Sequence, residues 1–84
     1  STKSMIGHAL GAAGALESVA CVLMLRDQFV HPSINSEDVH PEIEAYANSI
    51  PHVVRDMSEL NTMIKAGFGF GDVNACVIFR KWVA

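Results

Sequence analysis

The stretch STKSMIGHALGAAGALES, residues 1–18, decides the fold expected of this chain. It places Lys3, His8 and Glu17 around several glycines, and the residues from 11 to 27 are nearly all compatible with a helix. We therefore predict a helix over residues 11–27. His8 lies in the loop that precedes this helix, and Glu17 lies on its second turn.

The predicted helix is unusually apolar and unusually rich in glycine at its start. Gly7, Gly11 and Gly14 follow one another at spacings of four and three residues, so one face can bring the backbone close to another helix or to a sheet. Few polar residues remain to face solvent, and we expect the helix to be buried on several sides. The apolar residues are Leu16, Val19, Ala20, Val22, Leu23, Met24 and Leu25.

The rest of the chain predicts a connector, a loop and two strands. Residues 30–35, VHPSIN, suit an edge strand or an extended connector because a proline interrupts them. Residues 36–61 are expected to form a surface loop with a turn of helix. Residues 62–66 and 75–82 have strand composition, and the run ACVIF is typical of a strand covered on both faces. Residues 67–74, GFGFGDVN, would connect them, which makes the fold class α/β.

Composition narrows the class of protein. The 84 residues allow one domain at most, yet 50% are hydrophobic and the mean hydropathy is +0.26, which suggests a piece of something larger. Six basic against nine acidic residues give a net charge of −3 without a basic cluster, so we expect neither nucleic acid nor an anionic membrane as partner. The longest apolar run, residues 19–25, is far shorter than the ~20 residues that a bilayer requires.

The two cysteines are expected to be structural. Cys21 and Cys76 lie in apolar segments without the spacing of metal ligands, so we read them as reduced core thiols, which favours the cytoplasm. Burial in apolar surroundings suppresses the thiolate, so neither is expected to be a nucleophile.

Taken by themselves, the polar residues of the first stretch allow two interpretations. His8 in a glycine-bounded loop can donate or accept a proton near neutral pH, but a lone histidine is more often structural. Lys3 and Glu17 can equally form a surface ion pair contributing ~0–1 kcal/mol. In GFGFG, Phe68 and Phe70 either cap a core or accompany a turn whose N–H groups cradle an anion or form an oxyanion hole.

Three segments together resemble the C-terminal end of a β-ketoacyl-[acyl carrier protein] synthase. This family comprises the condensing enzymes of type II fatty acid biosynthesis and the ketosynthases of polyketide synthesis. The segments are residues 1–18, HPSIN at 31–35 and GFGFGDVNACVIF at 67–79. The resemblance implies the C-terminal portion of a thiolase-like layered αβαβα fold. Residues 1–84 would form a partial C-terminal half of the domain, with the nucleophilic cysteine and a first histidine in segments that do not occur here.

The resemblance also implies roles for individual residues. His8 resembles the second active-site histidine, which donates a hydrogen bond to the thioester oxygen while malonyl-carrier protein loses carbon dioxide. Lys3 resembles the lysine that organises the site, and Glu17 the glutamate that supports it. Phe70 matches the gating phenylalanine, whose N–H helps to form the oxyanion hole, and residues 68–69 (Phe68 and Gly69) shape that loop.

The glycine-rich loop departs from the family in two places. Ala66 and Gly67 stand where the family commonly has asparagine and serine, and Asp72 and Val73 stand where it has glycine and threonine. We therefore expect the residues just behind the site to be altered.

The candidates for these altered residues behind the site are Lys65, Asp72 and Asn74. In many relatives the region beside the glutamate holds a small cation, and we hypothesise that the ammonium group of Lys65 replaces it and compensates Glu17. The alternative is a solvated strand lysine. No metal site is predicted from these residues.

The activity implied is that of an acyltransferase, exercised only by a longer chain or an assembly. It would join an acyl thioester to malonyl-carrier protein by decarboxylative Claisen condensation, without a metal or organic cofactor, the acyl groups arriving on phosphopantetheine. Expected partners are acyl carrier protein, the remainder of the ketosynthase chain, and a second subunit in a homodimer or heterodimer. The alternative is a non-catalytic, ketosynthase-like partner subunit that sets chain length.

Overall fold

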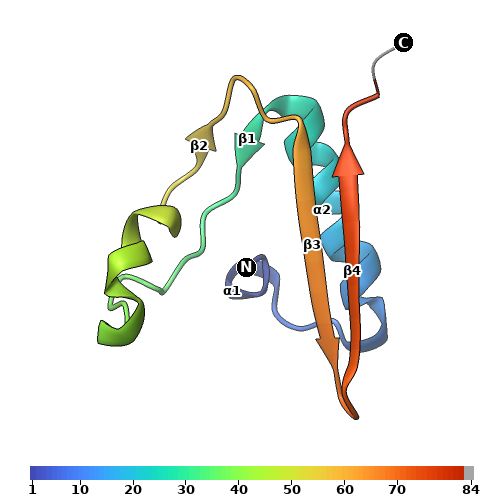
Figure 1. Cartoon of the computed structure of the whole chain (residues 1–84), viewed down its shortest axis with the longest axis horizontal. Helices are drawn as coiled ribbons and strands as arrows, with labels where there is room; N and C mark the ends of the chain where they lie inside the picture. Colours follow the sequence, from blue (N-terminus) through green and yellow to red (C-terminus); the bar gives the residue numbers. More distant parts are fainter. Residues whose placement is uncertain (83–84) are drawn as a thin grey trace.

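The computed structural model describes residues 1–82 and shows a mixed helix and strand fold (Figure 1). A long β-hairpin packs on one helix, and a smaller lobe with a two-stranded sheet lies beside them. In chain order the elements are α1 (Lys3–Ile6), η1 (Leu10–Ala12), α2 (Ala13–Asp27), β1 (Phe29–Val30), η2 (Pro41–Ser49), β2 (Arg55–Asp56), β3 (Thr62–Gly69) and β4 (Val73–Arg80). The short helix α1 was not expected from the sequence.

Helix α2 confirms the predicted helix, with a later start. The α-helix begins at Ala13 because a 3₁₀ turn, η1, precedes it, and Leu10 at the start of that turn has a positive φ of 54°. The helix ends at Asp27 because Gln28 adopts the left-handed conformation, and its backbone N–H donates to the carbonyl of Met24. His8 lies in the loop between α1 and η1, as predicted.

Strands β3 and β4 form an antiparallel hairpin that is longer than predicted. Lys65 pairs with Val77 and Gly69 with Val73, so only residues 70–72 form the turn. The predicted connector, 67–74, was therefore too long. Gly71 in the turn has φ 80°, a conformation that favours glycine, and a β-carbon on Gly69 would lie 3.1 Å from the carbonyl oxygen of Val73. The glycines permit the strands to continue almost to the tip.

Helix α2 covers one face of the hairpin, and the core between them is small (Figure 1). Only Cys21, Met24 and Leu25 are buried hydrophobic residues among those described. Val19 and Val22 stay about half exposed, so the expectation of a helix buried on several sides is wrong for this chain. The prediction that ACVIF is covered on both faces is also wrong, because α2 contacts only one face of the hairpin and β4 is exposed along most of its length.

The register of the hairpin corrects the prediction for one cysteine. Cys76 pairs with Ala66, whereas the neighbouring pair, Lys65 and Val77, belongs to the face that carries the part-buried residues of β3. Because successive side chains of a strand alternate between faces, Cys76 lies on the opposite face and is exposed. Cys21 is buried, as predicted.

The middle of the chain is more ordered than the predicted surface loop. Within residues 30–35 only Val30 belongs to a strand, the two-residue β1, which pairs antiparallel with β2. The nine-residue η2 begins directly after His40, whose ring accepts a hydrogen bond from the N–H of Glu42, and has Pro41 at its first position. Helix η2 and strand β2 both fall within residues 36–61, where only a turn of helix was expected.

None of the helices within residues 1–82 has the length and apolar character needed to cross a bilayer.

Candidate active site

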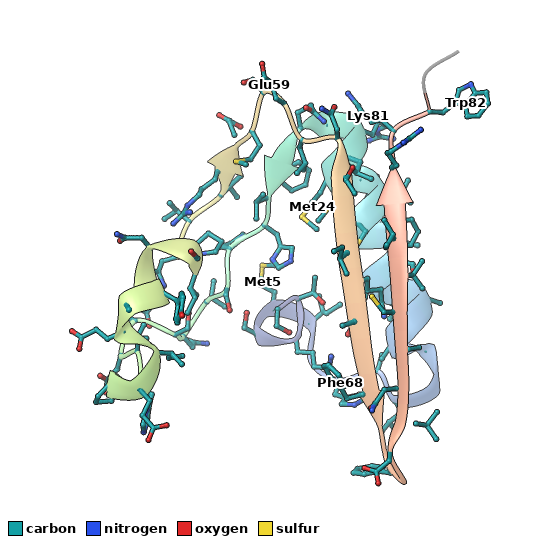
Figure 2. The ribbon with its side chains drawn as sticks, viewed as in Figure 1. Met5, Met24, Glu59, Phe68, Lys81 and Trp82 are labelled. Atoms are coloured by element: carbon teal, nitrogen blue, oxygen red, sulfur yellow. The ribbon has the colours of Figure 1, made fainter. Side chains whose placement is uncertain are left out.

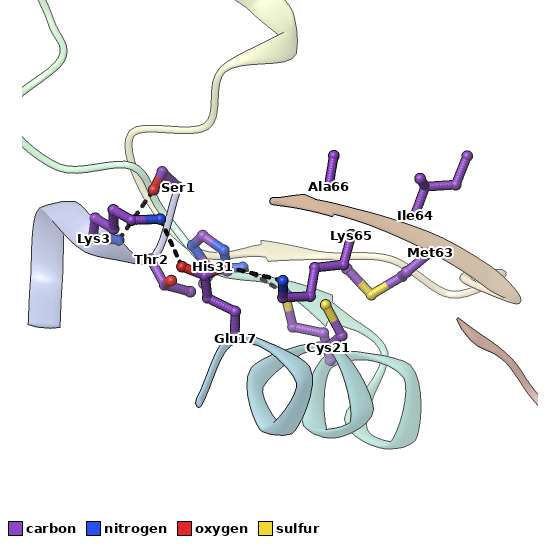
Figure 3. Close-up of a pocket in the computed structure, with 11 residues that line it drawn as sticks. Ser1, Thr2, Lys3, Glu17, Cys21, His31, Met63, Ile64, Lys65 and Ala66 are labelled. Atoms are coloured by element: carbon purple, nitrogen blue, oxygen red, sulfur yellow. Dashed lines mark hydrogen bonds and ion pairs between the residues drawn. The ribbon is translucent and has the colours of Figure 1, made fainter. Parts of the chain in front are cut away.

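Two lysines from different elements pair with one carboxylate, which belongs to a third element. Lys3 of α1 places its Nζ 2.7 Å from Oε2 of Glu17 on α2, and Lys65 of β3 places its Nζ 3.3 Å from Oε1 of the same residue (Figure 3). The side chains of Glu17 and Lys65 are 16% and 13% exposed, so Lys65 is not the solvated strand lysine of the alternative interpretation. Two ammonium groups thus share one mostly buried carboxylate.

The lysines stabilise the charged form of Glu17. The hydrogen bond from Lys3 lowers the pKa of Glu17 most, and that from Lys65 adds to it, while partial burial opposes both. The net effect is a pKa below the ordinary value. Glu17 is therefore a fixed negative charge at neutral pH.

His8 is held in one orientation by the backbone. The N–H of Leu10 donates a hydrogen bond to Nδ1 of His8 at 2.9 Å. In the neutral ring the proton then belongs on Nε2. The neutral ring of His8 therefore has Nε2–H free to donate a hydrogen bond, while Nδ1 already accepts one.

The hairpin tip and the charged cluster border one open cleft of about 680 Å³. Its wall includes Lys3, His8 and Glu17 from the first stretch, together with Lys65 and residues 68–70 of the hairpin. Phe70 is fully exposed and Phe68, near the turn end of the hairpin (Figure 2), is 80% exposed, so neither caps a core in this chain. The structure brings the principal predicted site residues to one cleft.

Two predicted residues do not reach the cleft. Asp72 lies in the turn with φ 60°, and Asn74 on β4 pairs with Phe68 and is exposed. Neither lines the cleft, although the neighbours Val73 and Ala75 do. A place for Asp72 and Asn74 just behind the site therefore stays a prediction, because their absence from the lining of the cleft does not decide it.

A smaller cavity of about 250 Å³ has the same ion pairs in its wall (Figure 3). Lys3, Glu17 and Lys65 line both cavities, whereas Cys21 and His31 line the smaller one and not the larger cleft. Sequence reasoning gave His31 no role, and its only signal was its place in the HPSIN segment. Burial raises the pKa of the Cys21 thiol, which agrees with the expectation that it is not the nucleophile.

The small cation implied by the resemblance does not fit this site. Each oxygen of the Glu17 carboxylate already has an ammonium group beside it. Within residues 1–82 no three histidine, cysteine, aspartate or glutamate side chains gather as they would around a metal ion. A further cation would add a third positive charge to a single negative one.

The chain is similar to known proteins of one family. Residues 1–37 match the family model described as β-ketoacyl synthase, C-terminal domain. Over 82 residues, 98% of this chain, it is 43% identical to 3-oxoacyl-[acyl-carrier-protein] synthase 2 of Rhizobium meliloti (strain 1021). The chain belongs to the β-ketoacyl synthase family. This similarity extends over both helix α2 and the hairpin.

Two further β-ketoacyl synthases are equally similar. The chain is 43% identical over 98% of its length to 3-oxoacyl-[acyl-carrier-protein] synthase 1 of Haemophilus influenzae, and 43% identical, again over 98%, to the chloroplastic synthase I of Hordeum vulgare. It spans 19%, 20% and 17% of the three relatives, in the order given. The chain therefore corresponds to about a fifth of the length of each of these three relatives.

Proposed function

We propose that this chain supplies part of the active site of a β-ketoacyl-[acyl carrier protein] synthase, which extends an acyl chain in fatty acid or polyketide synthesis. The observation that carries the proposal is the common cleft. His8, with Nδ1 occupied by the Leu10 N–H, borders the same cleft as Lys3, Glu17 and residues 68–70. A fixed donor beside charged groups in a pocket suits a reaction that creates an oxyanion.

The reaction proposed begins with decarboxylation of malonyl-carrier protein. The bond between the carboxylate carbon and Cα breaks, carbon dioxide leaves, and the electron pair forms an enolate whose negative charge lies on the thioester oxygen. A hydrogen bond from Nε2–H of His8 stabilises that charge. Because the charge is absent from the starting thioester, the donor lowers the barrier more than it strengthens binding.

Condensation follows at a cysteine outside this chain. The enolate carbon attacks the acyl thioester carbonyl, a carbon–carbon bond forms, and the cysteine thiolate leaves with the electron pair of the carbon–sulfur bond. The N–H of Phe70 would stabilise the tetrahedral oxyanion, and its ring would gate access. Cys21 and Cys76 do not line the cleft, which supports a nucleophile from elsewhere.

Lys3 and Glu17 would act on His8 through the electrostatics of the cleft. The Lys3 ammonium, held at 2.7 Å by Glu17, is a fixed positive charge near the place where negative charge develops. The proposal includes acyl carrier protein as partner, the acyl groups arriving on its phosphopantetheine, and a dimeric protein in the cytoplasm. It requires no metal or organic cofactor.

The test is decarboxylation of malonyl-carrier protein by the full-length protein that contains this sequence. We expect His8→Ala to lower kcat roughly 10²–10³-fold, the usual effect of removing one oxyanion donor, with KM little changed. The matched control is His40→Ala. His40 is also exposed and also accepts a hydrogen bond from the N–H two residues on, but it does not border the cleft.

The control variant should keep the activity of the unmodified protein. Equal activity of the His8 and His40 variants would contradict the role of His8. A full-length protein that binds carrier protein but neither decarboxylates nor condenses would instead favour the non-catalytic partner subunit. Asp72, a non-glycine residue with φ 60° at the hairpin turn, is the feature that suits an altered loop of that kind.

A further inference from the structure

We infer that the ammonium group of Lys65 is a built-in cation, which supplies beside Glu17 the positive charge that the family resemblance assigns to a small ion. The protein would then be indifferent to small cations at this site. The inference deepens the proposed function, since it concerns the same site, but its test does not depend on activity.

The first evidence for a built-in cation is the set of charges around Glu17. Glu17 would be a mostly buried carboxylate with one partner if it met Lys3 alone, and Lys3 is 43% exposed. The second partner, Lys65, is 13% exposed and comes from the hairpin. A carboxylate removed from water needs its remaining oxygen satisfied, and the Lys65 ammonium does this at 3.3 Å.

The second piece of evidence is the position of the Lys65 ammonium group. It lies between helix and hairpin, against two residues without side chains: a β-carbon on Gly67 or Gly14 would be 3.5 Å or 3.9 Å from Nζ. Lys65 and Glu17 both line the larger and the smaller cavity. The ion pair is therefore part of the wall between two cavities, where a small ion could reach Glu17 if the lysine were absent.

Lys65 borders the cleft, but its ion pair is with Glu17, so we regard it as a positioning residue. Holding Oε1 of Glu17 fixes the carboxylate, and the carboxylate in turn fixes Lys3 through Oε2. The hairpin is thereby tied to α1 as well as to α2.

The experiment measures the melting temperature of the full-length protein in ammonium, potassium or choline chloride at equal ionic strength. Choline is too large to fill the space of one ammonium group, so it serves as the reference. Three variants are compared with the unmodified protein. Lys65→Ala opens the space, Lys65→Gln fills it without charge, and Lys81→Ala removes an exposed lysine just beyond β4.

The unmodified protein and Lys81→Ala should each melt at the same temperature in all three salts. Lys65→Ala should melt roughly 2–4 °C lower in choline chloride and recover at least half of that loss in ammonium or potassium chloride. Lys65→Gln should also melt lower, but without recovery, because no ion can enter. The cation-specific recovery separates a built-in charge from a merely structural side chain.

Two results would overturn the inference. One is a melting temperature of the unmodified protein that is higher in potassium chloride than in choline chloride, with the same difference in the Lys81→Ala variant. The other is a Lys65→Ala variant that no small cation restores. If Lys65→Ala does not fold in any salt, including ammonium chloride, the inference is likewise overturned, because the added ion should replace the lost group. None of these results bears on whether the protein condenses acyl chains.

Discussion

The backbone N–H of Leu10 lies 2.9 Å from Nδ1 of His8 and donates a hydrogen bond to it. The bond spans two residues and forms in the loop before η1, where Leu10 has a positive φ. It determines which ring nitrogen carries the proton when the histidine is neutral. His31 shows the opposite arrangement, because its Nδ1 lies 2.9 Å from the carbonyl oxygen of Pro32, which can only accept.

We therefore predict opposite tautomers for two histidines of this chain. Neutral His8 should carry its proton on Nε2, and neutral His31 on Nδ1. Nitrogen-15 NMR of the full-length protein, with each signal assigned by substitution, measures this directly. The same tautomer at both positions would contradict the hydrogen bonds described here.

Glu17 should make stability depend on pH in the acid range. Its pKa is lowered from 4.5, chiefly by the hydrogen bond from Lys3, so the folded state binds this proton less readily than the unfolded state. The stabilisation is complete above about pH 4.5 and is lost as pH falls through the lower folded pKa. We expect the free energy of unfolding of Glu17→Gln to vary less over this range than that of the unmodified protein.

Denaturant titrations from pH 6 to pH 3, about the range that brackets this change, measure the effect. Glu37→Gln, which alters an exposed residue outside the cleft, is the control and should retain the pH dependence of the unmodified protein. Parallel curves for Glu17→Gln and the unmodified protein would show that the ion pairs do not stabilise the carboxylate.

Gly69→Ala should destabilise the hairpin. The added β-carbon would lie 3.1 Å from the carbonyl oxygen of Val73, and this backbone atom cannot move freely because Gly69 and Val73 are partners in the ladder. We expect a loss of about 1 kcal/mol in the free energy of unfolding. Gly14→Ala is the contrast: its nearest neighbour is 3.9 Å away, and a helical position gains about 0.5–1 kcal/mol from alanine. Thermal unfolding that ranks the two variants in the reverse order would refute this account.

Gln28 should be one of the strongest single contributors to the attachment of helix α2 to the segment that leads into β3. Its amide nitrogen donates to the carbonyls of Leu25 and Leu60, at 2.6 Å and 2.7 Å, and its amide oxygen accepts from the Leu60 N–H at 2.9 Å. We expect Gln28→Ala to cost about 1–3 kcal/mol, since part-buried backbone groups lose their partners.

A second substitution separates this effect from backbone strain at the same position. Gln28 has φ 57°, a conformation that asparagine tolerates well, but the shorter side chain cannot span the same distance. Gln28→Asn should therefore remain clearly destabilised in denaturant unfolding. Stability equal to that of the unmodified protein would mean that the conformation, and not the hydrogen bonds, explains the alanine variant.

The local elements of this chain follow from its sequence. Helix α2 is formed by residues of high helical propensity, and the hairpin by two strand-forming runs around glycines, because both depend on neighbours a few residues apart. The loop position of His8 follows from the same local rules. The resemblance of three short segments to the β-ketoacyl synthases could also be read from the sequence, because it rests on the residues of these segments and on their order along the chain.

The tertiary structure decided which of these residues meet. Lys65 lies far from Glu17 in the sequence, and only the packing of the hairpin on α2 brings Nζ within 3.3 Å of the carboxylate. The exposure of Cys76 was likewise settled by strand register, since a shift of one residue would reverse the face on which it lies. Propensity acts through neighbours along the chain, whereas the partner of a charge depends on distances in space that no local pattern records.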